Sequence, residues 1–190
     1  MGWISTRRSV WRMKCCPVLA KGIAGAAIFL WFGDAGLDAQ QRAPADLPAV
    51  FSALEGAWEG SGVLLGRPAV FEMRWEAGRS GFVDLTFSNA WTEEGGSSAP
   101  ALSARATYFV GAASASGVWI DDRPQRLRLD AVVTDSSVVT NWFAETETGR
   151  TEYIVRSPTS VMVRDFVLVE GADRLFAEAS YQRAAIGPGG

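Results

Sequence analysis

From residue 57 onward, apolar and polar side chains alternate in short runs that turn-forming residues separate. Such alternation is typical of β-strands with one buried face. The runs are 57–65, 69–77, 81–91, 102–111, 116–121, 125–134, 138–145, 149–156, 159–169 and 173–182. Their short connections favour hairpins between successive strands. Because closure removes exposed strand edges, the pattern predicts an all-β fold, a single antiparallel up-and-down β-barrel of about ten strands. Two stacked open sheets are the competing architecture.

A lead-in and a short helix are predicted before the strands, over residues 40–53. Apolar residues at positions 47, 50, 51 and 54 have helical spacing. Pro48 lies near the start of this segment, where proline is tolerated. We expect the helix to plug one end of a barrel that spans residues 54–184, and residues 185–190 to form a flexible tail.

The first 39 residues have the layout of an export signal. A basic region with Arg7, Arg8 and Arg12 precedes the apolar run 22–32, and small residues follow. We expect removal after Ala39, with Ala35 as the alternative, and a periplasmic or secreted protein. General secretion and the twin-arginine route both stay open, as does a start at Met13. The apolar run is short for a membrane span, so stable membrane insertion after cleavage is not expected.

The composition beyond residue 39 restricts the chemistry. Thirteen arginines face nineteen acidic residues, a net charge of −6, without lysine, cysteine or histidine. The absence of histidine and cysteine excludes a Ser-His-Asp triad, a thiol nucleophile and an imidazole metal ligand. An acidic chain without a basic patch also argues against nucleic acid as a partner. We predict no catalytic residue and no metal site, and leave the oligomeric state open.

The inward faces of the strands give a candidate lumen. Trp58, Gly60 and Gly62 share a face, and the glycines are expected to leave space above the indole. A neighbouring large side chain that fills this space is the alternative. The inward aromatic residues expected to line the lumen are Trp75, Phe87, Tyr108, Trp142 and Tyr153.

One charge is also expected inside the barrel. Strand 159–169 is apolar on both faces, so either Arg164 or Asp165 must point inward. A charge inside a barrel needs a partner or a ligand. We predict Arg164 as the polar anchor for a ligand, with a structural ion pair or a position near the rim as the alternative.

The run Leu54-Glu55-Gly56-Ala57-Trp58-Glu59-Gly60-Ser61-Gly62 resembles the start of calycin-type, lipocalin-like barrels. It is most similar to nitrobindin-like and uncharacterised exported bacterial lipocalin-like domains. The resemblance implies that Arg183 packs across Trp58 as a structural lid. Nitrobindin-like proteins hold haem through a histidine, which this chain lacks, so histidine-ligated haem is excluded and no cofactor is predicted. Ligation through Tyr153 or Tyr181 would be the remaining route to haem.

Three functions follow from these expectations. The leading one is a non-enzymatic exported barrel that binds a small apolar or amphipathic molecule in its lumen. The second is a structural or protein-interaction module with a filled barrel and outward aromatic residues such as Phe143 or Trp119. The third is a histidine-free isomerase or hydratase, which needs a carboxyl with a raised pKa beside an inward tyrosine. An internal volume above about 300 Å³ separates the first from the second.

Overall fold

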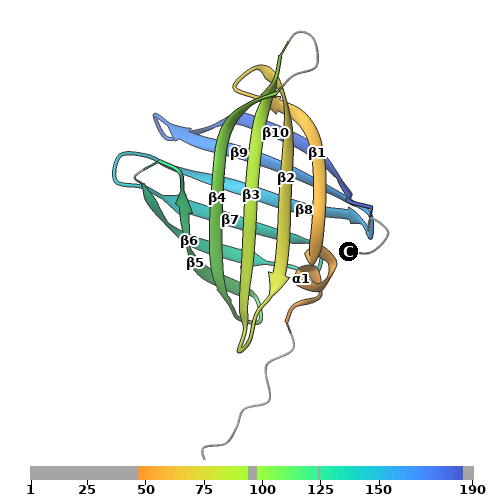
Figure 1. Ribbon diagram of the computed structural model, residues 1–190. Helices are drawn as coiled ribbons and strands as arrows, with labels where there is room; N and C mark the ends of the chain where they lie inside the picture. The colour runs from red at the N-terminus through yellow and green to blue at the C-terminus, as the bar shows by residue number, and fades with distance from the viewer. Residues whose placement is uncertain (1–46, 94–97, 124, 186–190) are drawn as a thin grey trace, which may run out of the picture. The chain divides into compact units, whose positions relative to one another are not determined.

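The computed structural model describes residues 47–93, 98–123 and 125–185. Within these residues, ten antiparallel strands form a closed barrel, and one short helix, α1 (Ala49–Leu54), precedes them (Figure 1). In chain order the strands are β1 (Gly56–Leu64), β2 (Arg67–Ala77), β3 (Phe82–Thr92), β4 (Ser98–Val110), β5 (Ser114–Asp121), β6 (Arg126–Val133), β7 (Ser137–Phe143), β8 (Thr148–Ser157), β9 (Ser160–Val169) and β10 (Ala172–Arg183). The predicted all-β antiparallel up-and-down barrel is therefore confirmed.

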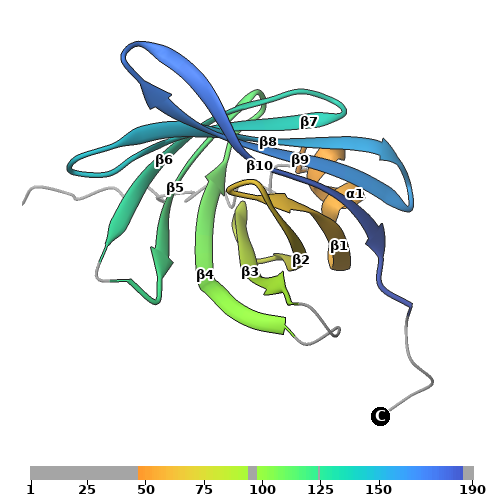
Figure 2. The same cartoon turned by 90° about the horizontal axis from the view of Figure 1, so that it is seen from above.

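Each strand pairs with its neighbours in the chain, and β1 pairs with β10 to close the sheet. Strands β2, β3 and β4 form one wall, and β7, β8 and β9 cross behind them (Figures 1 and 2). Because closure leaves no free strand edge, the two stacked open sheets are ruled out.

The buried faces follow the predicted alternation in most strands. On β2, Phe71, Met73 and Trp75 are all at most 3% exposed. On β6, Leu127, Leu129, Ala131 and Val133 are buried in the same way. The core therefore forms from one face of each strand, as period two requires.

Two irregularities depart from the prediction. Strand β4 begins at Ser98 rather than near residue 102, and Pro100 pairs with Ala90 next to a register shift. Proline lacks an N–H group and is tolerated in a strand at such a bulge. In β10 the register shifts between Leu175 and Ala177. The predicted inward position of Leu175 is therefore wrong, because this residue is 48% exposed while Phe176 turns toward the core.

Trp58 and Arg183 join the two ends of the described chain. The two residues pair across β1 and β10, and the Arg183 guanidinium lies 4.3 Å from the centroid of the Trp58 ring. The Trp58 indole donates a hydrogen bond to the carbonyl of Leu54 (2.7 Å). Arg183 donates to the carbonyls of Ala53 (2.8 Å), Glu55 and Pro158.

These bonds attach α1 to the barrel. A helix of six residues is too short to be stable alone, and three carbonyls at its C-terminal end accept hydrogen bonds from Trp58 and Arg183. Phe51 also packs edge-on against Trp75, with 6.1 Å between ring centroids. The helix contacts β2 and β8; that it plugs this end of the barrel stays a prediction.

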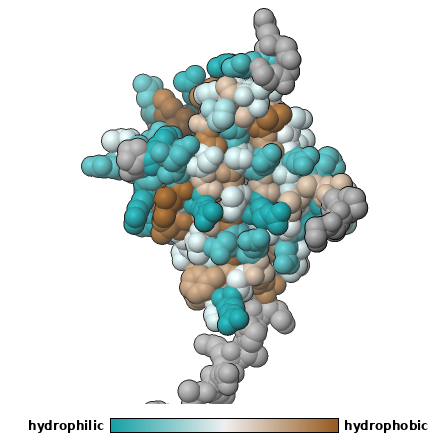
Figure 3. Space-filling model, viewed as in Figure 1, coloured by the Kyte–Doolittle hydropathy of each residue, from teal (hydrophilic) through white to brown (hydrophobic). Residues whose placement is uncertain are grey.

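The outer surface is mixed in character. Hydrophilic and apolar side chains are interspersed on the face that Figure 3 shows. Some exposed apolar residues pack on one another, such as Phe82 and Phe109 at 5.4 Å. Within residues 47–93, 98–123 and 125–185, no helix is long and apolar enough to cross a membrane.

The predicted termini fall mostly outside the described residues. Residues 1–46 and 186–190 are not described. The export signal (1–39), the lead-in and the tail therefore stay predictions.

Replacing Arg183 tests the attachment of α1. R183M removes three hydrogen bonds and the contact with the Trp58 ring, so we expect the free energy of unfolding to fall by about 2–3 kcal/mol. Denaturant unfolding measures the change. The matched control is R174M on the same strand, where the arginine is exposed and makes no hydrogen bond or ion pair within the described residues. Equal stability of the two variants would contradict the proposed attachment.

Candidate functional site

A cavity of about 470 Å³ occupies the part of the barrel away from α1. It reaches the end of the barrel formed by the β1–β2, β5–β6 and β7–β8 connections, where Leu65, Arg123 and Glu147 line it. Pockets that hold small molecules range from about 300 to 1,000 Å³. The lumen therefore has the size of a ligand site, and its mouth lies at the end opposite α1.

Four of the aromatic residues expected in the lumen line this cavity: Phe87, Tyr108, Trp142 and Tyr153. Trp75 does not line it but packs behind it. Its ring stacks on Tyr108 (5.7 Å between centroids) and meets Tyr153 edge-on (5.1 Å). Trp75 thus forms part of the packed layer beneath the two tyrosines.

The expected space above Trp58 does not exist. A Cβ atom on Gly60 would lie 2.8 Å from the Tyr181 ring, which fills that position. A Cβ atom on Gly62 would lie 2.0 Å from the carbonyl oxygen of Glu178, because the β10 backbone approaches closely there. The glycines therefore permit close contact between β1 and β10, and the alternative of a neighbouring side chain that fills the gap holds. Trp58, Gly60 and Gly62 do not line the cavity.

The inward charge on β9 is Asp165, and the expected inward position of Arg164 is wrong. Asp165 lines the cavity together with Val163 and Val167, its neighbours at period two. Arg164 points to the other face, where it forms an ion pair with Glu152 (2.7 Å). Arg150 bonds to Glu152 as well (3.1 Å) and extends the pair to Asp173 (2.7 Å).

Asp165 is held by the strand beside it. Thr151 on β8 is its register partner and donates a hydrogen bond from its hydroxyl to Oδ1 of Asp165 (2.6 Å). The side chain is half-buried, and it lines the cavity. Burial raises the pKa of Asp165 to about 6, and the Thr151 hydrogen bond opposes part of this rise.

Neutral hydroxyl groups of Tyr108, Thr140 and Tyr153 line the cavity together with Asp165. The hydroxyl oxygens of Tyr108 and Thr140 lie 3.4 Å apart. Burial raises the pKa of Tyr108 to about 12, and burial followed by neighbouring charge raises the pKa of Tyr153 well above its usual value. Burial and the negative charge of Asp165 have the same effect on the pKa of Tyr181. Tyrosine ligation of haem requires a phenolate, so these shifts disfavour it at Tyr153 and Tyr181.

At the mouth of the cavity, Asp121 and Arg123 form an ion pair. Asp121 accepts hydrogen bonds from the Trp119 indole (3.1 Å) and from the Arg123 guanidinium. These bonds lower the pKa of Asp121 against the effect of its burial. Trp119 lines the cavity, so its expected outward position is wrong. Ala115 and Gly117, four and two residues before it, were the signal that this face is inward.

Two polar atoms near the mouth lack partners. Asn89 is 8% exposed and lines the cavity, and no described group bonds to its Oδ1. The Trp91 indole nitrogen is likewise without a hydrogen-bond partner within the described residues, although the Arg67 guanidinium lies 4.9 Å from the ring centroid. Buried polar groups are ordinarily hydrogen-bonded, so these atoms are available to a molecule in the cavity.

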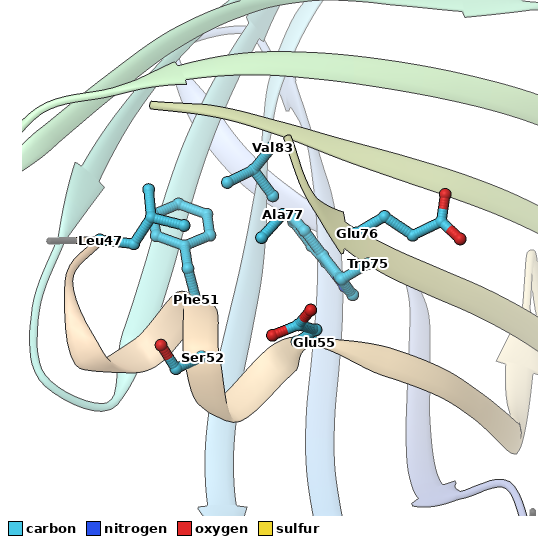
Figure 4. A pocket seen from close by; sticks show the side chains of 8 residues that line it. All are labelled: Leu47, Phe51, Ser52, Glu55, Trp75, Glu76, Ala77 and Val83. Carbon is cyan, nitrogen blue, oxygen red and sulfur yellow. The ribbon is translucent and has the colours of Figure 1, made fainter. Parts of the chain in front are cut away.

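A second, smaller space lies beside α1 (Figure 4). Leu47, Phe51, Trp75 and Val83 line it together with polar Ser52 and Glu55. Its volume of about 60 Å³ is far below that of a ligand pocket. It is a packing gap that is too small for a ligand.

The described residues contain no group of three or more acidic, histidine or cysteine side chains placed to hold a metal ion. Asp121 is paired with Arg123, and Asp130 with Arg128 at 3.2 Å. Each of these two carboxylates is therefore paired with an arginine.

Comparison with known proteins supports the fold. No protein-family model matches the chain, and no curated protein matches its sequence. The crystal structure of Rv2717c from M. tuberculosis is similar, with a TM-score of 0.56 and 16% identity over 72% of this chain and 98% of that chain. This likeness shows a shared fold, consistent with the lipocalin-like resemblance; the finer likeness to nitrobindin-like domains stays a prediction.

Other barrels match less closely. The S-type phycobiliprotein lyase CPES from Guillardia theta matches with a TM-score of 0.49 and 10% identity over 70% of this chain and 90% of that one. The redesigned β-barrel mFAP1 bound to DFHBI matches with a TM-score of 0.41 and 12% identity over 71% and 99%.

The raised pKa of Asp165 predicts a stability that depends on pH. The pKa is about 6 in the folded protein and 3.8 in the unfolded chain, so ionisation destabilises the fold as pH rises through this window. We expect D165N to be more stable than wild type at pH 7.5, by about 3 kcal/mol at most, and to lose this advantage at pH 4. Denaturant unfolding at both pH values measures it.

The control for this experiment is D130N, which removes an exposed carboxylate outside the lumen. Its effect should change little between the two pH values. An equal advantage of D165N at pH 4 and pH 7.5 would show that burial does not perturb this carboxyl.

Proposed function

We propose that this protein binds a small amphipathic molecule in the lumen of its barrel. The observation that carries the proposal is the cavity of about 470 Å³, whose walls combine aromatic rings with a few polar groups. Ligand sites have this composition because apolar walls supply affinity and a few fixed polar groups supply orientation. The apolar part of the ligand would lie against Phe87, Trp119 and Phe176, and its polar part would reach Asp165.

The filled module is the weaker alternative. The cavity exceeds the lower limit of about 300 Å³ for ligand pockets. Trp119 also faces the lumen rather than the surface. On the outer face, Phe143 lies under the Arg128 guanidinium (4.4 Å), so it is not a free aromatic surface either.

Export is part of the proposal and rests on the sequence of residues 1–39. The basic region, the apolar run and the small residues before Ala39 support it. We place the mature protein in the periplasm or outside the cell.

Filling the lumen tests ligand binding. Ala101 lines the cavity on β4, whereas Ser103 on the same strand is exposed. We expect the neutral apolar dye N-phenyl-1-naphthylamine to bind wild type and S103W with enhanced fluorescence. In A101W we expect at least a tenfold loss of affinity, because the indole occupies the site.

A second filling variant, V167W, guards against misfolding of the first, and cooperative thermal unfolding confirms that each variant is folded. Val167 lines the cavity from β9. The proposal fails if wild type binds neither the dye nor the naphthyl probes described below, or if folded A101W and V167W bind the dye as wild type does.

A histidine-free isomerase is a second candidate, and Asp165 is the observation that favours it. A general base works best with a pKa near the working pH, and the pKa of Asp165 is raised to about 6. Its charge also acts on Tyr108 and Tyr153, so neutral phenols that can donate a hydrogen bond lie nearby. Such a pair can remove a proton beside a carbonyl group and stabilise the resulting enolate.

Proton exchange tests this candidate. With 1-indanone in D₂O, an enzyme of this kind would exchange the protons next to the carbonyl faster than buffer, as followed by proton NMR. The exchange should be lost in D165N and retained in D130N. A rate equal to that of buffer with wild type removes the candidate for ketones of this size.

A further inference from the structure

We propose that the molecule bound in the lumen carries a positively charged amine or amidine group, with Asp165 as its counter-ion. This inference rests on the proposed function and adds the chemical class of the ligand. It comes from the balance of charge inside the cavity.

The cavity has more negative than positive charge. Three ionisable acidic or basic side chains line it within the described residues: Asp165, Glu147 and Arg123. Arg123 already forms an ion pair with Asp121 at the mouth. Among the described residues, the lumen therefore has no free cation for Asp165, and a ligand carboxylate would meet repulsion from Asp165 and Glu147.

Asp165 has one oxygen available to a ligand. Its Oδ1 accepts the Thr151 hydrogen bond, whereas no hydrogen bond to Oδ2 is found within residues 47–93, 98–123 and 125–185. The nearby hydroxyl groups of Tyr108 and Tyr153 are neutral, because burial raises the pKa of each. They supply hydrogen bonds but no charge to balance a carboxylate.

A cationic ligand supplies what this carboxyl lacks. Burial opposes its ionised form, and an ammonium group bonded to Oδ2 would favour that form. A hydrogen bond between two charged groups is also about twice as strong as one between neutral groups. The ionised form of Asp165 is therefore unfavourable when the cavity is empty and favourable when an amine is bound.

The walls around Asp165 also suit an organic cation. Tyr108, Trp142 and Tyr153 line the same cavity, and aromatic faces attract cations. Asn89 adds a buried Oδ1 acceptor without a described partner. An amine or amidine carries several N–H donors. A ligand long enough to span the cavity could therefore donate to both Oδ2 of Asp165 and Oδ1 of Asn89.

Three probes that share a naphthyl ring and carry a positive, a neutral or a negative head group test the inference. We choose 2-(1-naphthyl)ethylamine, 2-(1-naphthyl)ethanol and 1-naphthylacetate, and measure their binding by calorimetry at pH 7.5. Wild type should bind the amine at least about tenfold more tightly than the alcohol, and bind the acetate least. D165N should bind the amine and the alcohol equally, because it keeps the shape of the site and loses the charge.

D130N is the matched control, since it removes an equal charge from the outer face. It should keep the preference for the amine. Glu147 at the mouth is tested separately with E147Q, which should retain most of the preference if Asp165 is the counter-ion. Thermal unfolding verifies that D165N is folded.

The outcomes separate this inference from the proposed function. If the alcohol binds wild type as tightly as the amine, or D165N keeps the preference, the inference is wrong while lumen binding stands. Loss of the preference in E147Q rather than D165N would also overturn it. If none of the three probes nor the neutral dye binds, both proposals fail.

Discussion

The contact between the first and last strands is the constraint on which this structure depends. A ten-strand barrel closes only if β1 and β10 pair, and here Trp58–Leu64 pair with residues 177–183. Gly62 makes this possible, since any side chain there would collide with the carbonyl of Glu178. Trp58 and Arg183 pair at the other end of the seam and bond to the carbonyls of α1. The closure of the sheet and the attachment of the helix thus share the same few residues.

Much of the fold could be predicted because its signal is local. Alternation on β2 and β6 identified the buried faces directly, since period two depends on neighbouring residues alone. The bulge in β10 could not be predicted this way. It depends on how β9 and β10 pair, and it reversed the expected positions of Leu175 and Phe176. The early start of β4 has the same origin in pairing with β3.

The site was less predictable than the fold, and for a physical reason. Alternation required one of Arg164 and Asp165 to face inward, but it could not decide which one. The decision came from β8, where Thr151 pairs with Asp165 inside and Glu152 pairs with Arg164 outside. The free volume was also misplaced. Glycine signals a missing side chain, whereas the space it leaves depends on the strand opposite, and here Tyr181 fills the position above Gly60.

Trp75 separates the cavity of the barrel from the small gap beside α1. It lines the small gap, and it packs against Tyr108 and Tyr153 beneath the cavity. A ligand with a long chain would therefore have no straight path through the centre of the barrel. A ligand bound in the cavity, as proposed, would have to leave through the mouth by which it entered. One ligand could then replace another only after the first had dissociated, so dissociation would limit the rate of exchange.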